Sequence, residues 1–319
     1  MKPSAIIAKT FPFMLIRLLA YLVFFIGICI YTAIVVWILG AIKPEGFFAF
    51  VSFAIFGGGG WAIYRFVRDY INYMIKAAHV AVVADMAIKG GVPEGFNMYN
   101  YGVSKVKKFF VASNVLFAVD RLVSGSVRQI QRVFGGIGEF LKFIPGIKGL
   151  TQILNMFVDI ILNYLDECIM AYIFLNEGQN VWKSAADGVV LYAQNWKTIL
   201  KTGGKILLFL LIFSLIAFLI FLPISKGIFG GVDSLESGLA MPIAWAITIA
   251  FVLVLKWAIL DSIIMIYMMC GYLKVAYGAQ PSYDLYGKLQ GMSKKFKELF
   301  GKSQEAQNTG ANPASGAPV

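Results

Sequence analysis

Four long apolar runs separate the polar and charged stretches of this chain, and they predict membrane-spanning helices. The runs cover residues 11–40, 47–67, 206–224 and 241–273. About 20 apolar residues in a helix cross the roughly 30 Å hydrocarbon core of a bilayer. We therefore predict an all-α, polytopic integral membrane protein. Arg17 lies near the start of the first run, and we expect its long side chain to snorkel to the membrane surface.

The second apolar run contains four consecutive glycines, Gly57–Gly60. Glycine weakens a helix, and it also allows two helix backbones to approach closely. The glycines therefore predict either a break in the helix or a close contact with another helix. A phosphate-binding loop is disfavoured, because the run lacks the Lys-Ser/Thr pair that such a loop needs.

Residues 151–175 are strongly apolar and yet carry three carboxylates. Ionisable groups at membrane depth are costly and indicate function by default, although packed or interfacial helices also carry polar stripes. Both flanks are basic, so either residues 135–150 cross as a partner span, giving six crossings, or the stretch lies at the membrane surface or re-enters, giving four. We favour four crossings. Helical spacing places one polar stripe along Asn155, Asp159, Asn163 and Asp166.

Residues 103–134 combine helically spaced apolar positions with a basic side. Basic amphipathic helices of this kind lie in the membrane interface with their cations toward anionic headgroups. We therefore predict lipid binding here, and the alternative is a helix packed on a neighbouring subunit. Residues 176–205 also have an interfacial pattern. The lipid-binding candidates are Lys105, Lys107, Lys108, Arg121, Arg128 and Arg132.

Composition supports a membrane protein and narrows its chemistry. The chain is 59% hydrophobic and 14% charged, whereas soluble proteins contain about 25% charged residues. The net charge of +11 points to an anionic membrane surface, because no soluble basic region is present to bind nucleic acid. The three scattered cysteines and the single histidine, His79, provide no spacing for a disulfide framework, a metal site or imidazole catalysis. We expect no enzyme activity, metal or cofactor.

The distribution of basic residues predicts topology and regions. Basic flanks stay on the cytoplasmic side, so we expect cytoplasmic N- and C-termini. The regions are a transmembrane helix pair (1–67), a basic amphipathic cytoplasmic or interfacial region (68–150), a C-terminal membrane region (151–275) and a basic, then disordered, cytoplasmic tail (276–319).

Two charged residues, Lys256 and Asp261, lie inside the last apolar run. A spacing of five residues places them about 140° apart on an α-helix. We therefore expect that they do not pair with each other and that each has another partner.

Several pieces of residues 150–285 occur in an order that resembles a known family. The pieces are IMAYIFLNEGQNVWKSAADGVVLYAQNWKTIL, a Gly-Gly-Lys start to a span in GGKILLFLLI, and a final long span with WAILDSIIMIYMMCGYLK. Together they resemble the C-terminal half of the choline transporter-like family. The resemblance implies cytoplasmic termini and movement of choline or ethanolamine. The large extracellular loop and several N-terminal spans of that family have no counterpart in this sequence.

These features support two hypotheses of function. The first is a transporter or channel-like protein for a small organic cation such as choline, in which carboxylates offset the positive charge and aromatic rings face the ammonium group. The second is a membrane scaffold or assembly subunit that forms homo-oligomers or larger complexes and binds anionic lipid. Candidates for a cation site are Asp159, Asp166, Asp261, Trp61, Tyr64, Trp245 and Trp257, and Asn155 and Asn163 are structural members of the polar stripe.

Overall fold

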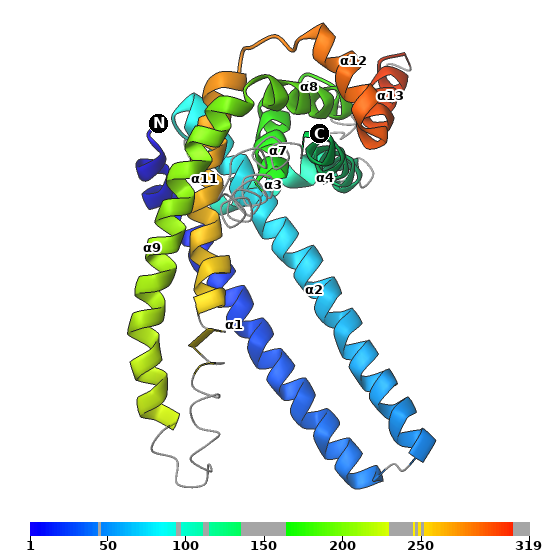
Figure 1. Ribbon diagram of the computed structural model, residues 1–319, viewed down its shortest axis with the longest axis vertical. Helices are drawn as coiled ribbons and strands as arrows, with labels where there is room; N and C mark the ends of the chain where they lie inside the picture. Colours follow the sequence, from blue (N-terminus) through cyan, green and yellow to red (C-terminus); the bar gives the residue numbers. More distant parts are fainter. Residues whose placement is uncertain are drawn as a thin grey trace, which may run out of the picture.

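The protein is helical throughout the part of the chain that its structure describes. The computed structural model describes residues 1–43, 46–93, 97–110, 115–134, 164–229, 245, 248–249 and 252–308. Within these ranges it contains helices and no β-strand, so the prediction of an all-α fold is confirmed. Long helices extend toward one end of the molecule and shorter helices gather at the other (Figure 1). We call these two parts the legs and the cap.

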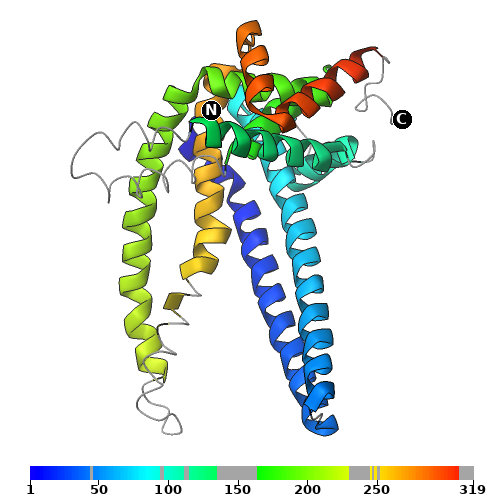
Figure 2. The same ribbon diagram turned by 45° about the vertical axis from the view of Figure 1, so that its right-hand side comes forward.

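Two pairs of antiparallel helices form the legs (Figure 1, Figure 2). The first pair is a hairpin of α1 (Pro3–Ile42) and α2 (Gly46–Lys89). The second pair joins α9 (Trp196–Phe229) to a helical stretch that includes η1 (Lys256–Leu260) and α11 (Asp261–Ala276). The upper ends of α2 and α11 continue into the cap, so legs and cap share continuous helices.

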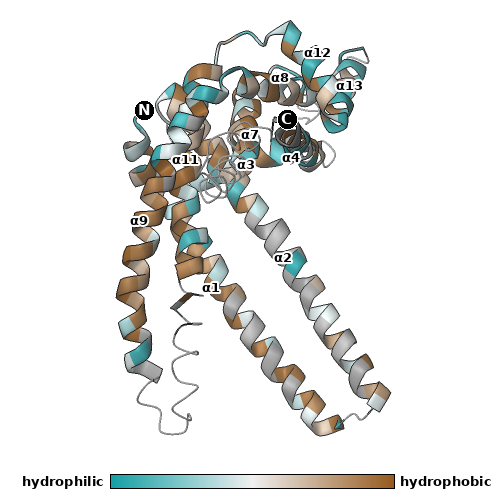
Figure 3. Cartoon of the chain, viewed as in Figure 1, coloured by the Kyte–Doolittle hydropathy of each residue, from teal (hydrophilic) through white to brown (hydrophobic). Residues whose placement is uncertain are grey.

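The legs have the composition and surface expected for helices in a bilayer. Within the described residues, three segments are long and apolar enough to cross a membrane: Pro3–Phe24, Trp196–Ile224 and Val252–Ala276. Hydrophobic residues predominate along α9 and much of α1 (Figure 3), and the side chains of Leu215 and Leu219 of α9 are 60% and 61% exposed. Apolar surface of this extent is rare on soluble proteins. These features fit a membrane protein.

The glycines of α2 mark a helix contact. The helix continues through Gly57–Gly60 without interruption. A Cβ atom built on Gly60 would lie 2.6 Å from the ring of Tyr31 in α1. The Tyr31 hydroxyl donates to the carbonyl oxygen of Phe56 at 2.6 Å, which fixes the ring over the glycine. The close-contact alternative is therefore confirmed, and the predicted break is wrong.

The helix α7 (Leu165–Leu175) lies at the centre of the cap, where it packs against α2, α8 and α11. Nine of its eleven residues are buried. A helix that is apolar on all sides needs protein or lipid around it, and here other helices supply that environment. The apolar stretch 151–175, which carries three carboxylates, thus ends in a helix of the cap. Its residues 151–163 lie outside the described residues.

The helix α8 (Val181–Gln194) completes this core. It begins after Asn180, whose side-chain oxygen accepts a hydrogen bond from the Trp182 amide at 2.9 Å. Ten of its fourteen residues are buried, including Ala185 and Val190. We expected an interfacial segment over residues 176–205. Instead, α8 is surrounded by α7, α4 and α13, because its small and β-branched residues allow close packing.

Two helices occupy the region in which the sequence predicted a single basic amphipathic helix. They are α3 (Met98–Phe110) and α4 (Val115–Phe134), and residues 111–114 lie outside the described residues. α4 packs against α8 and α13, and Val119 and Val123 on its apolar side are buried. This apolar side is used for packing within the same chain, so it is not available to enter a bilayer.

The region predicted as a cytoplasmic tail forms two helices of the cap, α12 (Tyr283–Met292) and α13 (Lys294–Asn308). Phe296 and Leu299 of α13 are fully buried. The regular spacing of these apolar residues between lysines gives α13 a face that packs on α4 and α8. The basic part of this region is therefore folded into the cap, and residues 309–319, where most of the predicted disorder falls, lie outside the described residues. The start of α1 and both of these helices lie at the cap end (Figure 1).

Candidate functional site

A single turn of π-helix lies within the third candidate span. In η1 the backbone N–H of Asp261 donates to the carbonyl oxygen of Lys256, five residues earlier. π turns are rare, and they occur frequently at functional sites. This one lies inside Val252–Ala276 and packs against α1. The charged side chains around it are therefore candidates for function.

The π turn brings Lys256 and Asp261 together. The Lys256 Nζ atom donates to Oδ1 of Asp261 at 3.1 Å. The prediction that these residues do not pair is wrong. It assumed α-helical geometry, whereas an i→i+5 hydrogen bond places residues five apart on the same face. Both side chains keep access to the surroundings, with exposed fractions of 37% for Lys256 and 20% for Asp261.

Tyr164, directly before α7, contacts the same carboxylate oxygen. Its hydroxyl donates to Oδ1 of Asp261 at 2.7 Å. Burial, and then the charge of Asp261, raise the pKa of the Tyr164 hydroxyl above its usual value. The hydroxyl therefore stays protonated and acts as a donor. This hydrogen bond connects the start of a cap helix to a leg.

Arg17 of α1 lies beside the π turn and is only 6% exposed. Its Nη1 atom donates to Oγ of Ser262 at 2.8 Å, and the Ser262 hydroxyl donates to the carbonyl oxygen of Ala258 at 3.1 Å. The Nε atom of Arg17 is buried without a hydrogen-bond partner among the described residues. The expectation that Arg17 snorkels to the membrane surface is wrong, because the side chain turns into the contact between α1 and α11.

Two aromatic residues follow these charged residues closely in the sequence, and their rings contact each other. Tyr21 follows Arg17 by one turn of α1, and Trp257 follows Lys256 directly. Their ring centroids are 6.3 Å apart with planes inclined by 36°. Aromatic faces attract cations within about 6 Å. The residues that we call the junction cluster are Arg17, Tyr21, Tyr164, Lys256, Trp257, Asp261 and Ser262.

Asp166, the second carboxylate named from the sequence, lies in a separate cluster inside the cap. Lys76 of α2 forms an ion pair with Glu167, and its Nζ atom is 3.9 Å from Oδ2 of Asp166. Asp120 of α4 lines the same small cavity as Asp166. Burial, and then the charge of Asp166, raise the pKa of Asp120 to about 7. The structure thus gathers three carboxylates around one lysine here and does not bring Asp166 to Asp261.

Lys105 is also held inside the cap. It is 5% exposed, and its Nζ atom is 2.5 Å from Oδ2 of Asp85 and 3.1 Å from Oε1 of Glu177. Lys89 and Tyr101 also contact Asp85. Burial opposes ionisation of Asp85, but these hydrogen bonds outweigh it and hold the pKa of Asp85 below its usual value. Lys105 is therefore engaged by protein carboxylates and does not face lipid headgroups.

The other lipid-binding candidates differ from Lys105 in their exposure. Lys107, Lys108, Arg121 and Arg128 are exposed on α3 and α4. The Lys108 Nζ atom is 2.9 Å from Oε2 of Glu177. The side chain of Arg132 lies outside the described part of the chain.

The remaining cation-site candidates are dispersed or outside the described structure. Trp245 packs against Phe218 of α9 with 5.3 Å between ring centroids, so it does not belong to the junction cluster. The side chains of Trp61 and Tyr64 lie outside the described residues. The same holds for the whole of Asn155, Asp159 and Asn163.

Sequence reasoning named Asp261 and Trp257 but not the rest of the junction cluster. Arg17 and Lys256 could have been found from the sequence, because each is an isolated charge in an apolar run. No feature of the sequence pointed to Tyr164. His79 is fully buried and its ring is stacked on Phe13 with 4.8 Å between centroids. His79 is therefore a packed residue of the helix core. Burial, and then the charge of Arg17, lower the pKa of His79 to about 3, which keeps the imidazole neutral.

The junction cluster offers the carboxylate of Asp261 for ion pairing with a cation, and Tyr21 and Trp257 supply aromatic rings of the kind that attract cations. Among the described residues, no group of three His, Cys, Asp or Glu side chains is arranged to hold a metal ion. No family model, no curated protein and no solved structure matches the chain. Its function must therefore be inferred from the arrangement of its own side chains.

Proposed function

We propose that this protein is a membrane carrier for a small organic cation and that Asp261 is the group that pairs with the cation. The observation that carries the proposal is the junction cluster. It combines a partly exposed carboxylate, an ammonium group already seated on that carboxylate and two adjacent aromatic rings. Carboxylates at such depth in apolar segments are costly, and they are typical of ion and substrate pathways.

Lys256 acts in this proposal as an internal substitute for the substrate. Its ammonium group is paired with Asp261 while the site is empty, and an incoming cation displaces it. The exchange costs little because partly exposed ion pairs contribute only about 0–1 kcal/mol. Tyr164 keeps its hydrogen bond to Asp261 in both states and holds the carboxylate in place. The ring faces of Tyr21 and Trp257 favour an alkylammonium over a small, strongly hydrated ion.

The resemblance to the choline transporter-like family makes choline the first substrate to test. It rests on short segments between residues 150 and 285. Trp257 and Asp261 lie within the segment WAILDSIIMIYMMCGYLK that carries it.

The proposal includes four membrane crossings with cytoplasmic termini. The lower half of α2 is the fourth crossing. The other three are the candidate spans Pro3–Phe24, Trp196–Ile224 and Val252–Ala276. The contact between Gly60 and Tyr31 supports it, because α2 runs against α1 along the same leg. Labelling of cysteines introduced at positions 2 and 302 from each side of the membrane tests it, and labelling from opposite sides would contradict it.

Uptake into vesicles containing the purified protein tests the function. Labelled choline should enter in a saturable manner, and an unrelated cation should not. The Asp261→Asn variant keeps the shape of the side chain and removes its charge, so saturable uptake should fall at least roughly tenfold. The matched control is Asp284→Asn on the exposed surface of α12, which should retain uptake. Full uptake by Asp261→Asn, with an unchanged particle in detergent, would rule out the proposal.

The alternative is a membrane scaffold that oligomerises and binds anionic lipid. The observation that favours it is the exposure of Lys107, Lys108, Arg121 and Arg128 on the cap. Each cation near an anionic leaflet contributes about 1 kcal/mol of attraction. Under this alternative neither Asp261→Asn nor Asp284→Asn alters any flux. Mass measurement in detergent would then show a complex of several subunits.

A further inference from the structure

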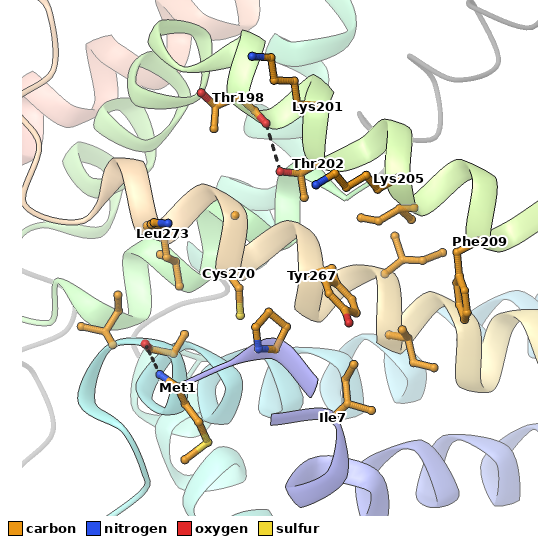
Figure 4. Close-up of a pocket in the computed structure, with 18 residues that line it drawn as sticks. Met1, Ile7, Thr198, Lys201, Thr202, Lys205, Phe209, Tyr267, Cys270 and Leu273 are labelled. Carbon is orange, nitrogen blue, oxygen red and sulfur yellow. Dashed lines mark hydrogen bonds between the residues drawn. The ribbon is translucent and has the colours of Figure 1, made fainter. Parts of the chain in front are cut away.

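A cavity of about 1000 Å³ lies between the start of the chain, α9 and α11, away from the junction cluster. On α9 its lining residues include Thr198, Thr202 and Phe209, and on α11 they include Tyr267 and Cys270. In both helices the lining positions recur every three or four residues, so one continuous face of each helix forms a wall. Figure 4 shows α9 above α11 and the chain start, with Met1 and Ile7, on the opposite side.

The cavity is charged at one end and apolar along its length. Three lysines line it: Lys201 and Lys205 in the first turns of α9, and Lys274 in the last turn of α11. Because α9 and α11 are antiparallel, these ends meet at the cap (Figure 1). Deeper positions carry only apolar or aromatic side chains such as Ile263 and Phe209. A molecule that fits must therefore have an anionic head and a hydrocarbon body.

The three lysines have no ion-pair partner among the residues that the structure describes. All three are exposed, and no carboxylate of the described chain forms an ion pair with any of them. No aspartate or glutamate lines the cavity. Lysines elsewhere in the cap behave differently, since Lys76, Lys105 and Lys183 each pair with a buried carboxylate. The cation cluster at the cavity is thus available to an external anion.

The position of the cavity agrees with a lipid as its occupant. Lys201 and Lys205 lie near the start of the candidate span Trp196–Ile224. After Lys205, α9 is apolar for about 20 residues. Lysines at this point lie at the level of headgroups, and the positions after them face hydrocarbon. Phe209, one turn below Lys205, is 45% exposed and continues the cavity toward the lipid-facing surface.

We infer that this cavity binds one anionic glycerophospholipid, with the headgroup phosphate at Lys201, Lys205 and Lys274 and an acyl chain along the groove between α9 and α11. The Thr198 hydroxyl lies beside the headgroup position and adds a polar contact, whereas the Thr202 hydroxyl donates to the carbonyl oxygen of Thr198 at 3.1 Å. The wall is closed behind the lipid where Gly271 meets Thr202, since a Cβ on Gly271 would lie 3.1 Å from the Thr202 hydroxyl. This inference is independent of the proposed transport.

Native mass spectrometry of the full chain in a neutral detergent tests the inference. Phosphatidylglycerol and phosphatidylcholine with identical acyl chains are added separately. One phosphatidylglycerol should remain bound per chain, and phosphatidylcholine should bind much more weakly. Replacing the three lysines together (Lys201→Gln, Lys205→Gln, Lys274→Gln) should weaken phosphatidylglycerol binding roughly tenfold to hundredfold. High salt should weaken binding to the unchanged protein, since the lysines are exposed.

The matched control removes the same charge from the cap surface. Lys288, Lys294 and Lys297 are exposed on α12 and α13, away from the cavity, and their triple replacement by Gln should leave binding unchanged. Equal losses in the two triple variants would show attraction by overall charge and would overturn the site. Equal binding of the two lipids would also overturn it.

A second variant tests the hydrocarbon part of the site. Ile263→Trp places a larger side chain in the groove wall without changing charge, and it should also weaken phosphatidylglycerol binding at least severalfold. Normal binding by this variant would contradict an acyl chain in the groove. Inorganic phosphate at the lipid concentration should not displace bound phosphatidylglycerol. Complete displacement would identify a site for free phosphate and overturn the lipid assignment.

Discussion

The cap and the legs place charged residues in opposite ways. In the cap, Asp85, Glu167 and Asp187 are buried and each is paired with a lysine, from another helix for Asp85 and Glu167 and from the same helix for Asp187. Among the described leg residues, ionisable side chains concentrate at the cap end, in the junction cluster and at the lysine-lined cavity. The cap thus resembles the core of a soluble protein stabilised by internal pairs. In the legs Arg17 is buried, but Asp261, Lys256 and the three lysines of the cavity are partly or fully exposed.

The largest expected effect comes from comparing a Leu→Ala substitution in the cap with a Leu→Ala substitution in a leg. Leu299 of α13 is fully buried in the cap, whereas Leu219 of α9 is 61% exposed on a leg. Leu299→Ala should cost about 3–4 kcal/mol, because it removes buried methyl groups and leaves a cavity. Leu219→Ala should change stability by less than about 0.5 kcal/mol, because its side chain faces detergent or lipid. Thermal unfolding of both variants in detergent provides the comparison. Equal losses would mean that α13 does not belong to the folded core.

The buried ion pairs of the cap predict a smaller loss of stability, which should appear only when a paired residue is replaced. Lys105→Met leaves Asp85 with Lys89 and Tyr101 alone, so it should cost roughly 2–3 kcal/mol, below the largest losses seen for broken buried pairs. The neighbouring Lys107→Met removes an exposed charge and should be nearly neutral. Chemical denaturation of the two variants measures the difference. If Lys107→Met proved the more damaging, the assignment of Lys105 to the interior would be incorrect.

The carboxylate cluster around Lys76 predicts a dependence on pH. The pKa of Asp120 is raised from 3.8 to about 7, so the folded protein binds a proton that the unfolded chain releases. The resulting stability is present below about pH 4 and is lost as the pH rises through about 7. Asp120→Asn should abolish this loss and be more stable than the unchanged protein at pH 8, by roughly 1–2 kcal/mol. Unfolding temperatures at pH 5 and pH 8 measure it, with Asp284→Asn as the exposed control. A pH dependence unaltered by Asp120→Asn would contradict the raised pKa.

Much of the fold could be predicted from hydrophobic patterning, because that pattern responds to one dominant force. Apolar runs of about 20 residues identified the legs, and Gly60 indicated a close helix contact. The cap was harder to predict. Its helices α7 and α8 are apolar or small-sided, and from sequence alone a helix buried in protein and a helix near a membrane look alike. α13 illustrates the same limit, because its lysines suggested a solvated tail although Phe296 and Leu299 are core residues.

The candidate site was predictable only in part, for a geometric reason. Asp261 and Trp257 were named because charge and aromatic rings inside an apolar run are informative on their own. The pairing of Asp261 with Lys256 depends on a π turn, and the residues KWAIL contain no proline or glycine that would signal one. Tyr164 and Arg17 reach Asp261 and Ser262 from elements more than 90 residues away in sequence. No local pattern encodes such contacts.

The most direct test of the proposed carrier is the concentration of choline that gives half-maximal uptake, measured in vesicles with the unchanged protein and with Lys256→Gln. If the ammonium group of Lys256 occupies the cation position on Asp261, removing it frees that position for choline. The half-saturating concentration should then fall severalfold, while the particle in detergent stays the same size. An unchanged or higher half-saturating concentration, or no saturable uptake by either protein, would contradict a cation site at Asp261.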